Sequence, residues 1–97
     1  MSRRPTLIDT HGNAIPRASK VAIAAVLARL VDLTCEGRRD YAMVYCEERA
    51  LSIMRLKGER LEYGVVQGAD TVGEFETPQP AIETFWAIFK AARDSDL

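Results

Sequence analysis

The sequence has few of the residues from which metal centres and catalytic sites are usually built. Its 97 residues include one histidine, His11, and two cysteines, Cys35 and Cys46. One histidine excludes a two-histidine metal site within a chain, and the cysteines show no metal-binding or redox spacing. No glycine-rich phosphate loop precedes a helical pattern, and no carboxylate pair stands out for acid–base work. We therefore expect a protein that is not an enzyme and has no cofactor or metal.

Long hydrophobic runs are also absent. No apolar stretch approaches the ~20 residues that span a bilayer, and the N-terminal Met1–Arg4 segment precedes Pro5 and Thr6 instead of the apolar run of a signal peptide. The net charge of -1, with 28% charged and 47% hydrophobic residues, is typical of a soluble globular chain. These features predict a cytoplasmic protein with no membrane contact. We expect an arm over residues 1–16, one domain over 17–94 and a tail over 95–97.

Three apolar-rich runs between Asp40 and Gln67 predict an antiparallel meander. Gly58 lies between the second and third runs, which favours a two-residue hairpin loop, Gly58–Glu59, with Leu56 opposite Leu61. The first two runs are joined by residues 47–50, which predict a four-residue loop around a type I turn.

In that register Cys46 lies opposite Leu51. Residues 71–76 predict a fourth, short edge strand whose charges discourage pairing with another chain.

This register gives the sheet two apolar faces. The face expected to form the core carries the aromatic and methionine side chains: Tyr41, Met43, Tyr45, Met54, Leu56, Leu61, Tyr63 and Val65. The opposite face carries smaller residues, with a charge pair at one end: Ala42, Val44, Cys46, Leu51, Ile53, Gly64 and Val66, then Arg55 and Glu62. Because this second face is too apolar to be left in water, we expect something to cover it.

Two helices are predicted beside the strands. Residues 17–36 contain no glycine or proline and precede Gly37, a natural C-terminal cap. The second helix begins with Thr77 as N-cap and Pro78 at the first helical position. Its apolar stripe has helical spacing: Ile82, Phe85, Trp86 and Phe89. The predicted fold class is α+β, an antiparallel sheet of three to four strands flanked by an N-terminal and a C-terminal helix, in the order α-β-β-β-(β)-α.

A fold of this kind without catalytic signatures favours a small protein–protein interaction module. We expect the second sheet face to bind a target protein or a second copy of the chain, as a homodimer, with an arginine rim around it. The alternative is that the first helix covers this face, so that each helix packs on its own side of the sheet and the protein is a monomer. The predicted partner-binding residues are Val44, Leu51, Ile53 and Val66, with Arg38, Arg39, Arg49, Arg55 and Arg60. By analogy of size, a stoichiometric inhibitor or adaptor is the expected role, as in the counter-defence proteins of phages, including those of the anti-CRISPR type.

Two other functions stay open from the sequence. Arg38, Arg39, Arg49 and Arg60 would serve a nucleic-acid-associated accessory protein, but acidic residues interleave with them and weaken phosphate binding. The second is a small-molecule-binding domain, with a pocket between sheet and helix lined by the aromatic residues Tyr41, Tyr45, Tyr63 and Trp86.

Overall fold

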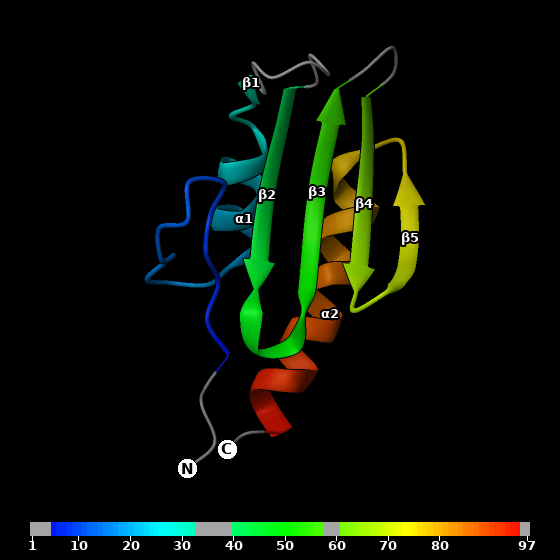
Figure 1. Cartoon of the computed structure of the whole chain (residues 1–97). Helices are drawn as coiled ribbons and strands as arrows, with labels where there is room; N and C mark the ends of the chain where they lie inside the picture. Colours follow the sequence, from blue (N-terminus) through cyan, green and yellow to red (C-terminus); the bar gives the residue numbers. More distant parts are fainter. Residues whose placement is uncertain (1–4, 33–39, 58–60, 96–97) are drawn as a thin grey trace.

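The fold is a five-stranded antiparallel sheet with two helices on one of its sides (Figure 1). The computed structural model describes residues 5–32, 40–57 and 61–95. The elements in chain order are α1 (Lys20–Leu27), β1 (Val31–Asp32), β2 (Asp40–Cys46), the 3-10 turn η1 (Glu47–Arg49), β3 (Leu51–Lys57), β4 (Leu61–Gln67), β5 (Asp70–Phe75) and α2 (Pro78–Ser95). The strands lie in the sheet in sequence order. The predicted α+β class is confirmed, β5 confirms the fourth edge strand, and β1 is an addition.

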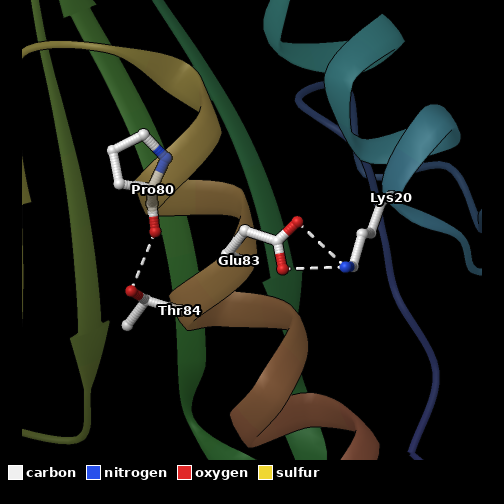
Figure 2. A network of polar contacts seen from close by, with 4 residues as sticks. All are labelled: Lys20, Pro80, Glu83 and Thr84. Atoms are coloured by element: carbon white, nitrogen blue, oxygen red, sulfur yellow. Dashed lines mark hydrogen bonds and ion pairs between the residues drawn. The ribbon is translucent and has the colours of Figure 1, made fainter.

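The C-terminal helix α2 forms as its sequence predicts. It begins at Pro78, and its stripe is buried at Ile82, Phe85 and Phe89. The Phe85 and Phe89 rings lie 6.4 Å apart, one helical turn from each other. An ion pair between Lys20 Nζ and Glu83 Oε2, 2.8 Å long, joins α2 to α1 (Figure 2).

The first helix is shorter than the prediction of 17–36. It begins after Ser19, whose hydroxyl accepts from the Ala22 amide, and it ends at Leu27. Val31–Asp32 then pairs with β2 as a strand. The last carbonyl groups of a helix have no hydrogen-bond donor within the helix. Here Arg55 donates a hydrogen bond to one of them, the Leu27 carbonyl, at 2.7 Å. Residues 33–36 of the predicted helix lie outside the described residues.

The register of β2 and β3 matches the prediction. Cys46 pairs with Leu51, and the connection is the predicted four-residue turn, formed by η1 and Ala50. Ala50 takes a left-handed conformation with φ 48°, which closes the turn. The loop length and the turn type therefore fixed this register from local sequence alone.

The register of β3 and β4 differs from the prediction by one residue. Lys57 pairs with Leu61, so the connection has three residues, 58–60, instead of two. Tyr63 consequently lies opposite Arg55, and Val65 opposite Ile53. A one-residue shift turns every side chain of a strand to the other face. Tyr63 and Val65 therefore join the small apolar residues and not the aromatic and methionine face.

The helices cover the sheet face that the predicted register leaves free. The residues beneath α1 and α2 are at most 4% exposed: Ala42, Val44, Cys46, Leu51, Ile53, Tyr63 and Val65. The assignment of the core to the opposite face is thus wrong. Small and β-branched side chains project little from the sheet, so the helices can approach it closely. The large rings of α2 then fill the space between helix and sheet. Burial also raises the pKa of the Cys46 thiol, which behaves here as a small apolar residue.

The N-terminal arm closes the outer edge of β2. Ile8 exchanges two backbone hydrogen bonds with Tyr45, at 2.9 and 3.0 Å. Between this pair and β1, the Thr10 hydroxyl accepts from the Met43 amide at 3.0 Å and donates to the Met43 carbonyl at 3.3 Å. The Thr10 hydroxyl thus makes the two hydrogen bonds that the backbone of a neighbouring strand would make. Along the described part of this edge, the outward-facing backbone groups of β2 are paired.

Candidate partner-binding face

The side of the sheet away from the helices carries a continuous apolar surface. Alternation along β2, β3 and β4 places six apolar side chains there, which we call the uncovered face: Tyr41, Met43, Tyr45, Met54, Leu56 and Val66. All six are half-buried by their neighbours in the sheet. In the described part of the chain no helix lies over them (Figure 1).

The size of this face is that of a functional patch. Three strands of seven residues, at a spacing of about 4.8 Å and a rise of about 3.3 Å, span roughly 14 by 23 Å, or roughly 330 Å². The largest apolar patch on a typical monomer covers ~300–600 Å² and is often functional. A standard interface buries ~800 Å² on each partner. A partner that binds here therefore also contacts the sheet edges or the strand ends.

A hollow of about 170 Å³ interrupts the face at Gly64. A Cβ atom built on Gly64 would meet no atom within 4 Å, so the missing side chain leaves open space. Met54, Leu56 and Val66 form apolar walls around it. Two exposed carboxylates, Glu62 and Glu74, also line it, together with Tyr63 and Thr71. The hollow therefore combines an apolar interior with an acidic rim.

Both charged side chains on the described part of the uncovered face are acidic. Glu62 is the cross-strand partner of Leu56, and Glu74 is the partner of Gly64, so both carboxylates belong to this side of the sheet. The two basic residues of β3, Arg55 and Lys57, alternate to the helix side. The face is consequently apolar at β2 and β3 and acidic toward β5.

Most predicted partner-binding residues lie elsewhere. Val44, Leu51 and Ile53 are 0% exposed beneath the helices, so the prediction that they contact a partner is wrong. The error follows from the choice of face, since both faces are apolar in the sequence. Among the described residues of the predicted set, only Val66 lies on the uncovered face, because the shifted β4 register brings it there.

The two described residues of the predicted arginine rim lie away from the uncovered face. Arg55 lies on the helix side, where it bonds to Leu27. Arg49 belongs to η1, at the turn between β2 and β3. Arg38, Arg39 and Arg60 fall outside the described residues, so their roles stay predictions.

The aromatic pocket predicted for a small molecule does not form. Tyr41 and Tyr45 lie on the uncovered face, whereas Tyr63 is buried on the helix side. Trp86 belongs to α2, where it packs against Phe89. The sheet separates the two groups of rings.

The sequence held one signal that marks the uncovered face. In the observed register Glu62 and Glu74 share its side, whereas the residues of the helix-covered face that are at most 4% exposed are all uncharged. Charged residues mark the solvated side of an antiparallel sheet. The predicted two-residue loop places Glu62 opposite Arg55, and therefore on the other face of the sheet, so the predicted register hides this signal.

No family model, curated protein or solved structure matches the chain. Among the described residues, no helix is long and apolar enough to cross a membrane. The same residues contain no group of three or more His, Cys, Asp or Glu side chains arranged to hold a metal ion.

Proposed function

We propose that the protein is a non-enzymatic binding module that attaches to another protein through the uncovered face. The observation that carries this proposal is the placement of both helices on one side of the sheet, which leaves an aromatic and methionine-containing surface on the other. Tyrosine and methionine are enriched at the centres of protein interfaces, where charged residues are depleted. A stoichiometric inhibitor or an adaptor needs only such a surface, because it acts by occupying its target.

The acidic rim indicates the chemistry of the partner. A surface complementary to this face presents apolar side chains for β2 and β3 and basic side chains for Glu62 and Glu74. The hollow at Gly64 suits a Lys or Arg side chain whose aliphatic stem packs on Met54 and whose charge meets the carboxylates. We therefore infer a partner that presents a basic side chain to the hollow at Gly64, beside the apolar part of its contact.

A second copy of this chain fits less well than a different protein. In a twofold dimer the same patch must complement itself. Within the described residues the uncovered face has no basic group to pair with Glu62 and Glu74. A homodimer through this face would bring unpaired carboxylates into the contact. Nucleic acid is disfavoured at this face for a similar reason, because its phosphates would meet carboxylates.

The test is affinity capture from the native cell with the wild-type chain and three variants. Met54→Glu places a charge in the centre of the face, and Glu74→Lys reverses one charge of the rim. Val21→Glu is the matched control, because Val21 is 79% exposed on α1, on the helix side. We expect a protein that wild type and Val21→Glu retain equally, and that both face variants lose at least tenfold.

Circular dichroism and light scattering on each variant separate a lost contact from a lost fold. A captured protein that Val21→Glu loses and Met54→Glu retains would move the binding site to the helix side and refute the proposal. A stable wild-type dimer that Met54→Glu converts to a monomer would instead identify a second copy as the occupant.

A further inference from the structure

A cavity of about 450 Å³ lies between the two helices, on the side of the sheet opposite the uncovered face. α1 forms one wall with Val21, Ala24 and Ala28, and α2 forms the other with Pro78 and Ile82. This volume is within the ~300–1,000 Å³ of small-molecule sites, which are mostly apolar with few polar groups.

The sequence of α1 explains why the helices leave this space. Ala24 and Ala28 are one turn apart and both exposed, so their methyl groups do not fill the gap toward α2. The Lys20–Glu83 ion pair bridges the helices at the border of the cavity (Figure 2). Both side chains of this pair are about half exposed, at 44% and 53%, so the charged pair lies at the solvent side.

The half-buried side chain of Arg55 is one of the polar groups of the cavity, with Lys20, Gln79 and Glu83. Arg55 lines it together with its cross-strand neighbour Tyr63. The Arg55 Nη1 atom donates to the Leu27 carbonyl at 2.7 Å, and its Cζ atom lies 5.7 Å from the centre of the Tyr63 ring. These two contacts hold the guanidinium in place. The Arg55 Nε atom is buried and has no hydrogen-bond partner among the described residues.

An unpaired buried donor is uncommon in a folded protein and calls for an acceptor. Because the donor carries a positive charge, an anionic oxygen makes the strongest partner. The cavity walls favour an apolar body attached to it. We propose that this cavity binds a small molecule with an apolar body and a carboxylate head, and that the carboxylate pairs with the guanidinium group of Arg55. This site is separate from the uncovered face and independent of the partner proposed there.

Isothermal titration calorimetry with three probes of equal tail length tests the proposal. Octanoate carries the carboxylate, 1-octanol is neutral, and octylammonium has the opposite charge. We expect the wild-type chain to bind octanoate at least about tenfold more tightly than 1-octanol, as a charge-assisted hydrogen bond implies. Octylammonium should bind more weakly still.

Two variants and two controls assign the binding to the cavity. Arg55→Met keeps the apolar stem and should bring the octanoate preference over 1-octanol below about twofold. Ala24→Trp fills the cavity from an exposed helix position and should abolish binding of all three probes. Lys57→Ala, which removes an exposed cation outside the cavity, and Met54→Glu, on the uncovered face, should bind octanoate like wild type.

The proposal is overturned if wild type shows no saturable binding of octanoate, or if it binds 1-octanol equally well. Retention of octanoate by Ala24→Trp would also overturn it. Arg55 donates a hydrogen bond to the end of α1, so the fold of Arg55→Met is checked by circular dichroism. If Arg55→Met does not fold, the assignment of binding to the cavity depends on Ala24→Trp alone.

Discussion

At the scale of single residues, Ala50 is the one described non-glycine residue with a left-handed backbone, at φ 48° and ψ 37°. An L-residue with a Cβ atom pays roughly 1–2 kcal/mol for this conformation. Glycine takes it freely but loses about 0.4–1 kcal/mol more entropy on folding. We expect Ala50→Gly to raise the free energy of unfolding by about 0.5–1 kcal/mol, measured by urea denaturation.

Ala28 provides the matched control for this substitution. It is also exposed and also follows a helical turn, but its φ is -71°. Ala28→Gly relieves no strain, so it should lower the free energy of unfolding by about 0.5–1 kcal/mol. Equal effects of the two substitutions would show that the left-handed conformation of Ala50 carries no strain.

At the scale of elements, the outer edge of β2 depends on one hydroxyl. Thr10 fills the gap between β1 and Ile8 by bonding both backbone groups of Met43. Thr10→Val keeps the shape of the side chain and removes both bonds. At roughly 0.5–1.5 kcal/mol per net hydrogen bond, the free energy of unfolding should fall by about 1–2 kcal/mol.

Hydrogen exchange gives this prediction a local readout. The Met43 amide should exchange faster in Thr10→Val than in wild type, while amides in the centre of β3 change only with global stability. Thr10→Ser restores the hydroxyl and should restore protection of Met43. If Thr10→Val protects the Met43 amide as well as wild type does, the hydroxyl does not close the edge.

Local sequence was sufficient for some elements and not for others. The start of α2 at Pro78, its apolar stripe and the turn between β2 and β3 are local signals, and the structure follows them. Gly58 suits a loop of two residues or of three, so it did not fix the β3–β4 register. Val31–Asp32 continues a helical pattern, but pairing with β2 makes it a strand. Both errors concern choices that depend on residues distant in the sequence.

At the scale of the whole molecule, the central question is which face of the sheet the helices cover. In the register predicted from the sequence, neither face is polar enough to answer it. In the structure the shape of the side chains decides between the faces. The small side chains of Val44, Ile53 and Val65 belong to the same core cluster as the rings of α2. The bulkier Tyr41 and Met54 stay on the outside. The side of the sheet that a partner can reach is therefore opposite to the one predicted from the sequence.

Neighbouring residues of β3 allow the most direct measurement of that claim. Ile53 is 0% exposed beneath the helices, and Met54 lies on the uncovered face. Ile53→Glu and Met54→Glu introduce the same carboxylate one residue apart, and urea denaturation compares their free energies of unfolding. A carboxylate buried without a partner costs several kcal/mol, so Ile53→Glu should lose at least about 4 kcal/mol or cooperative unfolding altogether. Met54→Glu should unfold cooperatively with a loss of about 1 kcal/mol or less. The reverse order, or equal losses, would contradict the assignment of the free face.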